Sequence, residues 1–340
     1  MNKRILVTGG AGFIAHHFIF EVLIRTDWDV VTIDRLDYSG NYNRLQEILE
    51  GLNPAERKRV TILYHDLKAE INPHIASRIG KIDYVAHIAA ASHVDRSIED
   101  PMSFVMDNVV GTTNILNYAR QLDSLEKFIY FSTDEVFGPA PEGVSYKEND
   151  RYNSTNPYSA SKAAGEEMAV AFENTYGMPI IITHTMNVFG ERQHPEKYIP
   201  MCIRKIRDGE TITVHSNAEK TKAGSRHYIH AHDVADACLF LLLNDFEVQY
   251  DYGHAKCPKY NIVGPTELDN LALAHLIADY QGKQLRYEMV DFHSARPGHD
   301  LRYALSGEKL AKLGWKPKPT HDRLMQVVDW TLKNPHWMEV

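Results

Sequence analysis

A glycine-rich turn close to the N-terminus constrains the fold of this chain more than any other feature. Residues 4–8 form a short apolar run, RILVT, and the turn GGAG separates it from the next apolar positions. This order predicts a strand, a tight turn and a helix. Glycines let backbone amides approach a ligand, and the positive end of a helix dipole favours an anion. The turn is therefore a candidate diphosphate site, with Gly9, Gly12, Phe13 and Ile14 as cofactor-binding residues.

A carboxylate at the end of the next apolar segment supports nucleotide binding. Asp34 follows residues 30–33, about 22 positions after Gly12, where a dinucleotide-binding fold places an acid on the ribose hydroxyls. Such an acid favours NAD over NADP because it repels a 2′-phosphate, although Arg35 could partly offset the repulsion. Without Asp34, the glycine turn could be no more than a tight connection between a strand and a helix.

Three further apolar segments alternate with helical patterns and predict buried parallel strands. These segments are residues 60–64, 82–91 and 127–132. The alternation predicts an α/β fold with a Rossmann-like doubly wound parallel sheet, whose ligands gather beyond the carboxyl ends of the strands. Asp66 and Leu67 follow one of these strands, and we expect them at the adenine edge, the alternative being a simple turn. The small residue Ala89 is expected to let the cofactor approach closely.

Two groups of polar residues are candidates for the chemistry. Thr133, Asp134 and Glu135 follow the strand predicted at residues 127–132, and Tyr158 and Lys162 lie four positions apart, on one face of a predicted helix. A lysine ammonium stabilises a phenolate, so we expect it to lower the pKa of Tyr158 and make it a general base. Taken alone, the tyrosine–lysine spacing is common by chance, and the acids could be a solvated strand end. Within a dinucleotide-binding fold, we interpret them as catalytic.

The composition argues against several other classes of protein. A net charge of −8 and the lack of a basic stripe argue against nucleic-acid binding. No apolar stretch reaches the roughly 18 residues of a membrane span. Three dispersed cysteines and an N-terminus without a signal peptide predict a cytoplasmic protein with reduced thiols. The His16-His17 pair and the HAHD segment at residues 230–233 lack a third ligand at a suggestive spacing, so no metal is expected.

The segments TGGAGFI, STDEVFG and YSASK, together with Asp34, resemble the extended short-chain dehydrogenase/reductases, and specifically the nucleotide-sugar 4,6-dehydratases. The resemblance runs from Lys3 to about Trp337. Its most specific part is the acid pair after Thr133, which sugar 4-epimerases of the same fold generally lack. The segments HIAAASHVDRSIEDP and RPGHDLRYA are similar to those of dehydratases that act on dTDP-glucose. Ala91 departs from the pattern, because those enzymes usually have glutamate at that position.

The resemblance implies a hydro-lyase that uses NAD to convert a nucleotide-diphosphate glucose into its 4-keto-6-deoxy sugar. It favours dTDP-glucose, with UDP-glucose as the alternative. Tyr158, assisted by Thr133, would deprotonate the 4-hydroxyl during oxidation at C4, and Lys162 would hold the nicotinamide ribose. Glu135 would then remove the C5 proton, Asp134 would protonate the departing 6-hydroxyl, and hydride would return to C6.

The resemblance also assigns the substrate site, the domains and the assembly. The expected substrate-binding residues are Ser92, Asn187, Glu196, Lys197, Arg226, Asn261, Arg296 and His299. Residues 1–186 are predicted to form the NAD-binding domain and residues 187–340 a smaller nucleotide-sugar-binding domain, interleaved because some of its segments return to the sheet. The family commonly forms homodimers through the helices that follow Pro101 and Tyr158.

Two other functions remain open at this stage. A UDP-sugar 4-epimerase would use NAD and Tyr158 but would leave Asp134 and Glu135 without a role. A non-catalytic NAD-binding sensor would explain the glycine turn and Asp34, but it would not explain why the five candidate catalytic residues occur together.

Overall fold

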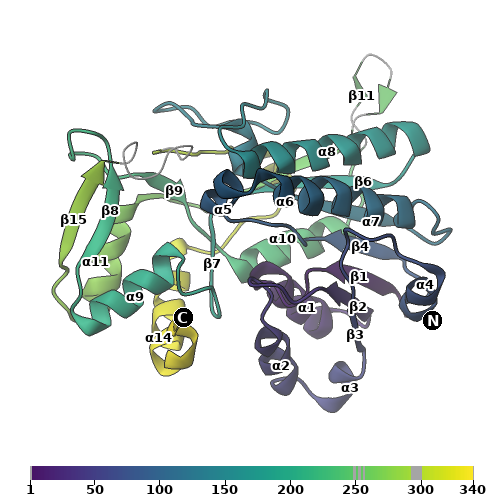
Figure 1. Ribbon diagram of the computed structural model, residues 1–340, viewed down its shortest axis with the longest axis horizontal. Coiled ribbons are helices and arrows are strands. Elements are labelled where there is room, and N and C mark those ends of the chain that lie inside the picture. The colour runs from purple at the N-terminus through teal and green to yellow at the C-terminus, as the bar shows by residue number, and fades with distance from the viewer. Residues whose placement is uncertain (1, 248–249, 252–253, 256, 292–300, 340) are drawn as a thin grey trace. The chain divides into compact units, whose positions relative to one another are not determined.

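The computed structural model describes residues 2–247, 250–251, 254–255, 257–291 and 301–339 (Figure 1). The chain divides into two compact units. The first comprises residues 1–136, 156–184 and 235–260, and the second comprises residues 137–155, 185–234 and 261–340. Each unit therefore draws on several stretches of the sequence. The assignment of NAD binding and sugar binding to separate domains stays a prediction.

The first unit is built on a sheet of seven strands. Their order is β13-β6-β5-β4-β1-β2-β3, and the pairs β1–β2, β1–β4, β2–β3 and β4–β5 are parallel. The strands are β1 (Arg4–Thr8), β2 (Asp29–Asp34), β3 (Val60–Tyr64), β4 (Tyr84–His87), β5 (Lys127–Thr133), β6 (Ile180–Thr185) and β13 (Lys259–Ile262). The strand order reverses between β1 and β4, which is where doubly wound sheets bind their ligands. The predicted Rossmann-like fold is confirmed.

Helices cover this sheet and complete the core of the unit. They are α1 (Phe13–Arg25), α2 (Tyr42–Glu50), α3 (Pro54–Arg57), α4 (Pro73–Ile79), α5 (Val94–Glu99), α6 (Pro101–Val105), α7 (Gly111–Ala119) and α8 (Pro157–Tyr176). All residues of β4 are buried, as in a strand covered on both faces. Tyr130 and Phe128 of β5 pack with Ile115 of α7 and Ala169 of α8 in one apolar cluster.

A π-helical segment interrupts the helix that follows Pro101. Residues Met106–Val110, labelled η1, lie between α6 and α7. A π-helical turn inserts an extra residue and redirects the side chains near it. In this chain it contains Asp107 and Asn108, whose contacts are described below.

The second unit consists of short strand pairs packed with helices. Its elements are β7 (Val188–Phe189), α9 (Tyr198–Asp208), β8 (Ile212–Ser216), β9 (Ser225–His227), β10 (Ile229–His230), β14 (Glu267–Asp269), α11 (Asn270–Tyr280), β15 (Tyr287–Asp291), α13 (Glu308–Lys312), α14 (Thr320–Lys333) and η3 (Pro335–Met338). Strands β8 and β15 pair in parallel, and β9 and β14 pair antiparallel. Ile203 of α9, Leu273 of α11 and Leu324 of α14 share one buried cluster.

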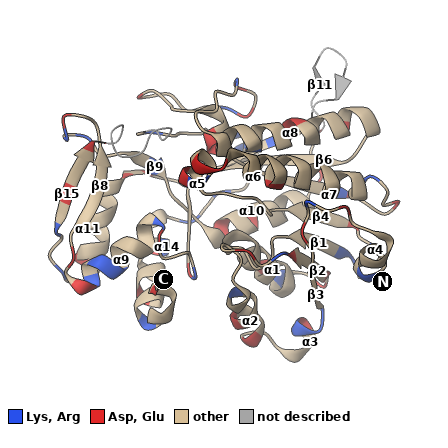
Figure 2. Ribbon diagram, in the orientation of Figure 1, with Lys and Arg blue, Asp and Glu red and all other residues tan. Residues whose placement is uncertain are grey.

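Three further elements complete the description. Helix α10 (Ala231–Leu243) spans the point at which the chain passes from the second unit to the first, and β11 (Tyr250–Asp251) pairs antiparallel with β12 (His254–Ala255). Lys205 and Arg207 lie in the last turn of α9, marked blue in Figure 2, where positive charge offsets the helix dipole. Among the described residues, no helix combines the length and the apolar character needed to cross a membrane.

Candidate active site

The glycine turn between β1 and α1 lies tightly against the end of β4. Gly9 has a φ of 76°, and a Cβ added there would come within 2.9 Å of the Cα of Ala89. A Cβ on Gly12 would come within 2.8 Å of the carbonyl oxygen of Gly9. Gly12 is also the N-cap of α1 and provides no side-chain cap, so the first turn, with Phe13 and Ile14, presents its backbone amides. These features fit the diphosphate of a dinucleotide. Ala89 lies against the glycine turn, and its contact with a cofactor stays a prediction.

Asp34, at the end of β2, holds the glycine turn in place. Its Oδ2 accepts a hydrogen bond from the backbone N–H of Ala11 at 2.9 Å, and its Oδ1 accepts one from Leu36 at 2.7 Å. Burial raises the pKa of Asp34, and these two backbone hydrogen bonds oppose the rise. The carboxylate therefore lies at the carboxyl end of the sheet, beside the turn, as the sequence predicted.

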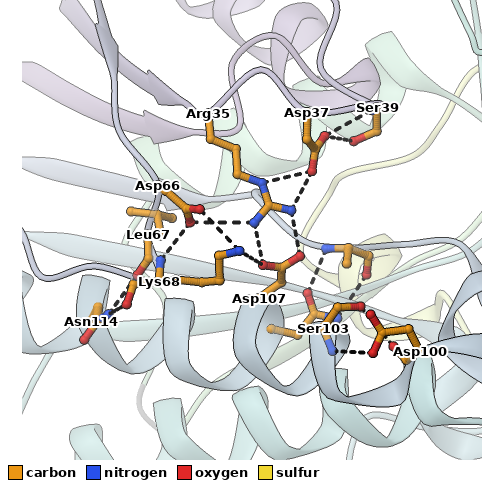
Figure 3. A network of polar contacts seen from close by, with 12 residues as sticks. Arg35, Asp37, Ser39, Asp66, Leu67, Lys68, Asp100, Ser103, Asp107 and Asn114 are labelled. Carbon is orange, nitrogen blue, oxygen red and sulfur yellow. Dashed lines mark hydrogen bonds and ion pairs between the residues drawn. The ribbon is translucent and has the colours of Figure 1, made fainter.

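Arg35 is held between two carboxylates next to Asp34 (Figure 3). Its Nη1 and Nη2 donate to Asp107 of η1 at 2.5 and 2.7 Å. Its Nε and Nη2 also donate to Oδ2 of Asp37, at 3.0 and 2.5 Å. The hydrogen bonds to Asp107 raise the pKa of Arg35 further, despite burial. Arg35 therefore keeps its positive charge, but the carboxylates of Asp37 and Asp107 balance it. The guanidinium is thus poorly placed to offset the repulsion between Asp34 and a 2′-phosphate.

The end of β3 lies beside the same network. Oδ1 of Asp66 is 3.6 Å from Nη1 of Arg35, and Asn114 of α7 donates to the carbonyl oxygen of Leu67 at 2.8 Å. Burial acts to raise the pKa of Asp66, but a backbone hydrogen bond from Lys68 and the charges of Arg35 and Lys68 leave it below its usual value. Asp34, Asp66 and Leu67 therefore gather at one edge of the sheet, and their contact with an adenine stays a prediction.

Strand β5 ends at the candidate catalytic residues. Thr133 is its last residue and donates to Oδ1 of Asp134 at 3.0 Å, and the N–H of Glu135 lies 3.4 Å from Oγ1 of Thr133. Asp134 and Glu135 begin the short 3₁₀ helix η2 (Asp134–Phe137). Thr133 and Asp134 are both buried. The strand end thus presents one hydroxyl and two carboxyl groups within a single turn of backbone.

Helix α8 brings Tyr158 and Lys162 to this strand end. Both side chains are buried, and the phenol of Tyr158 lies near enough to the hydroxyl of Thr133 for that hydroxyl to act on its pKa. Nζ of Lys162 donates to the carbonyl oxygen of Phe131 at 2.6 Å and lies 4.3 Å from the ring centroid of Tyr130. The structure therefore brings together the five residues that the sequence predicted to be catalytic.

The protonation of the tyrosine–lysine pair differs from the expectation. Burial raises the pKa of Tyr158 well above its usual value, the charges of Glu135 and Asp134 add to the rise, and the nearby hydroxyl of Thr133 opposes it. Burial also lowers the pKa of Lys162 to about 7, although the charge of Glu166 acts against this. The protein groups alone thus raise the pKa of Tyr158, whereas the sequence predicted a lowering. The reason is that both side chains are buried, and the acids next to Tyr158 repel a phenolate.

The predicted substrate-binding residues occupy varied environments. Ser92, between β4 and α5, and Asn187, Glu196 and Lys197 of the second unit are all exposed. Nη1 of Arg226 donates to the carbonyl oxygens of Ser225 and Leu301, both at 2.7 Å.

Asn261 is fully buried and donates to the carbonyl oxygens of Tyr146 and Ser306 at 3.1 and 3.2 Å. These bonds use its amide for bracing within the second unit. Arg296 and His299 lie outside the described residues. The substrate roles of all eight predicted residues stay predictions.

Two asparagines beside the catalytic residues did not emerge from the sequence. Asn156 is the N-cap of α8 and donates to Glu135 at 3.1 Å. Asn108 of η1 donates to Oγ of Ser161 at 2.9 Å and exchanges hydrogen bonds with the backbone N–H and carbonyl of Ala91. The pair Asn156-Pro157 is a helix-start signal that could have identified the first. No local signal marks the second, because its partners are distant in sequence.

Comparison with known protein families matches most of the chain to one family. The family described as GDP-mannose 4,6 dehydratase matches residues 6–328. The chain belongs to that family. Membership confirms the predicted resemblance and the enzyme class, a hydro-lyase that carries out 4,6-dehydration of a nucleotide sugar.

Similar proteins extend over the whole chain. A dTDP-glucose 4,6-dehydratase of Escherichia coli is 33% identical, over 99% of this chain and 94% of its own. A crystal structure of DesIV, the dTDP-glucose 4,6-dehydratase of Streptomyces venezuelae with NAD bound, superposes with a TM-score of 0.84 at 32% identity, over 99% of both chains. A UDP-glucose 4-epimerase of Thermus thermophilus in complex with NAD has a TM-score of 0.82 at 27% identity, over 96% of this chain and 98% of its own. NAD, the predicted cofactor, is the dinucleotide of both structures.

Proposed function

We propose that this protein is an NAD-dependent dehydratase that converts dTDP-glucose into the 4-keto-6-deoxy sugar nucleotide. One observation carries the proposal: the acid pair Asp134-Glu135 follows Thr133 directly at the end of β5, close enough to Tyr158 to act on its pKa. Oxidation at C4 needs Tyr158 and elimination needs the acid pair, and both must reach the same sugar. The relatives named dTDP-glucose 4,6-dehydratase favour the same substrate.

The residues around the glycine turn fit a dinucleotide. Gly9 and Gly12 leave no room for side chains, and Asp34 offers a carboxylate at the ribose end. The residues that would hold NAD are Gly9, Gly12, Phe13, Ile14, Asp34, Asp66, Leu67, Ala89, Tyr158 and Lys162. When bound, NAD supplies an acceptor for hydride from C4, returns that hydride to C6, and adds a positive ring that favours the tyrosine phenolate.

Tyr158 handles the proton of the 4-hydroxyl. Its phenolate accepts that proton as C4 becomes a ketone, and Thr133 orients the reacting oxygen through its hydroxyl. A high pKa in the protein means that the phenolate is a strong base once it forms, and the positive charge of Lys162 helps to stabilise it. Lys162 is held by the carbonyl of Phe131, so its ammonium stays at the end of β5.

Asp134 and Glu135 carry out the elimination. A ketone at C4 makes the neighbouring C5 proton acidic, and Glu135, ionised, removes it. Asp134, protonated, gives its proton to the 6-hydroxyl, which leaves as water. The proton that Glu135 takes balances the one that Asp134 gives, so the pair ends with the same total charge. Two adjacent acids in unlike surroundings are suited to such a division of roles.

A UDP-sugar 4-epimerase is the alternative, and epimerases are among the structural neighbours. An epimerase needs the tyrosine and the dinucleotide but has no step for a base at C5. The position of Asp134 and Glu135 beside Tyr158 therefore favours dehydration.

The test is to incubate the purified protein separately with dTDP-glucose and UDP-glucose and to record the alkali-dependent absorbance of 4-keto sugars. We expect a strong signal with dTDP-glucose and a weaker one, or none, with UDP-glucose. A signal confined to UDP-glucose would change the assigned base. A C4 epimer without any 4-keto product would refute the dehydratase.

We further propose that the protein is a cytoplasmic homodimer. Ile98 of α5 and Met102 and Val105 of α6, with Met106 of η1, are large apolar residues with 39–64% of their surface exposed. Such a cluster on neighbouring helices is typical of an interaction surface. Cys202, Cys238 and Cys257 are buried free thiols, which fits a reducing compartment.

A further inference from the structure

Asn156 connects the two groups of catalytic residues. As the N-cap of α8, its Oδ1 accepts a hydrogen bond from the backbone N–H of Ser159 at 2.8 Å. Its Nδ2 donates to Oε2 of Glu135 at 3.1 Å. Asn156 is 6% exposed, so both bonds are largely shielded from water. A single carboxamide thus contacts the start of the helix that carries Tyr158 and the carboxylate of Glu135.

The helix cap determines which way this carboxamide faces. The N–H of Ser159 can only donate, so Oδ1 of Asn156 must face it, and Nδ2 must then face Glu135. The backbone N–H of Asn156 also donates to Oγ of Ser159 at 3.3 Å, which completes a capping box. Glu135 therefore meets a fixed donor, and a donated hydrogen bond stabilises a carboxylate over the neutral acid.

We propose that Asn156 is a positioning residue for the elimination step, which orients Glu135 and keeps it ionised as the base for the C5 proton. The inference rests on the proposed 4,6-dehydration and adds a residue outside the tyrosine–lysine and acid pairs. Asn156 neither gives nor takes a proton. It acts through Glu135, and its place at the N-cap keeps that base in register with Tyr158, two residues further along the chain.

The substitution Asn156→Asp separates this role from capping. Aspartate caps helices as well as asparagine does, so α8 should keep its start and circular dichroism should show an unchanged helix content. The donor that faces Glu135 is replaced by a carboxylate oxygen, which repels it. With dTDP-glucose, we expect decay of the reduced-nicotinamide absorbance and uptake of solvent deuterium at C5 to slow about ten- to a hundredfold. The initial rise of that absorbance, which reports C4 oxidation, should slow less.

Two further variants serve as controls. Asn72 caps α4 in the same unit by accepting from the N–H of Ile75 at 3.0 Å, so Asn72→Asp makes the same change at a helix start away from these residues. It should leave both kinetic phases as in the wild type. Asn156→Ala loses the cap as well as the donor, and it should lower the melting temperature in addition to slowing elimination.

Three results would overturn the inference. Wild-type deuterium uptake in Asn156→Asp would restrict the residue to capping. Equal slowing of the rise and the decay would mean that Asn156 acts through the position of the helix and not through Glu135. A wild-type protein that makes no 4-keto product would refute the proposed function itself, and this inference with it.

Discussion

At the scale of single residues, burial decides the chemistry of the tyrosine–lysine pair. The four-residue spacing of Tyr158 and Lys162 is visible in the sequence, and the structure confirms that both reach the end of β5. The sequence could not show that both side chains are buried or that two acids face the tyrosine. Those surroundings reverse the direction expected for the pKa of Tyr158 and lower that of Lys162 to about 7.

Tyr158→Phe tests the role of the phenol oxygen. Turnover of dTDP-glucose should fall about a hundred- to ten-thousandfold, which is the usual contribution of a general base. Binding of the nucleotide sugar, measured by calorimetry, should change little because the ring still fills its site. Loss of binding would instead assign Tyr158 a structural role.

Lys162→Met tests how much the burial of Lys162 lowers the stability of the folded protein. The pKa of Lys162 is about 7 in the folded protein against 10.5 for an unperturbed lysine side chain. The unfolded chain therefore binds more protons between these values, and wild-type stability rises with pH across that window. In nucleotide-free protein, Lys162→Met should be more stable than wild type at pH 7 by about 2–4 kcal/mol. Urea unfolding should show this gain shrinking toward pH 10, and a variant less stable than wild type at pH 7 would contradict the account.

Arg35 provides a test of nucleotide choice. In the variant Asp37→Asn/Asp107→Asn, the guanidinium loses its two hydrogen-bonded carboxylate partners and keeps only the longer contact with Asp66, and the local negative charge also falls. Affinity for NADP relative to NAD should rise by about tenfold, or roughly 1.4 kcal/mol. Calorimetric titration of nucleotide-free protein with each dinucleotide measures this ratio. An unchanged ratio would mean that Asp34 alone sets the preference.

At the scale of elements, the strand ends were predictable and the helix interruption was not. Parallel strands bring their carboxyl ends to one edge, so Asp34, Asp66 and Thr133 could be placed from the apolar pattern alone. The π-helical segment η1 depends on contacts between distant residues: Asp107 binds Arg35, and Asn108 binds Ser161. No local periodicity encodes such contacts.

Asn108→Ala tests the importance of that segment. It removes the partner of the N–H and carbonyl of Ala91 and the donor to the hydroxyl of Ser161, at a position where the asparagine is 1% exposed. Chemical denaturation should show a loss of about 2–3 kcal/mol. The exposed Asn43→Ala is the matched control and should change stability by less than about 0.5 kcal/mol. Equal effects of the two substitutions would show that η1 is not a stabilising element.

At the scale of the whole molecule, the sequence predicted an α/β enzyme, and family membership agrees. The two compact units are assembled from interleaved stretches of chain, which no composition change along the sequence marks.

The proposed dimer can be tested by Met102→Glu, since a charge in the exposed apolar cluster should convert dimers into monomers. Sedimentation analysis would show this shift, and a wild-type protein that is already monomeric would refute the dimer.

The central claim is that hydride leaves C4 and returns to C6 with loss of water between. The most direct measurement supplies dTDP-glucose labelled with deuterium at C4 and locates the label in the product by NMR. The account predicts that the label moves to the C6 methyl group of a 4-keto sugar. A label that remains at C4 of an epimerised sugar would contradict it and establish the epimerase instead.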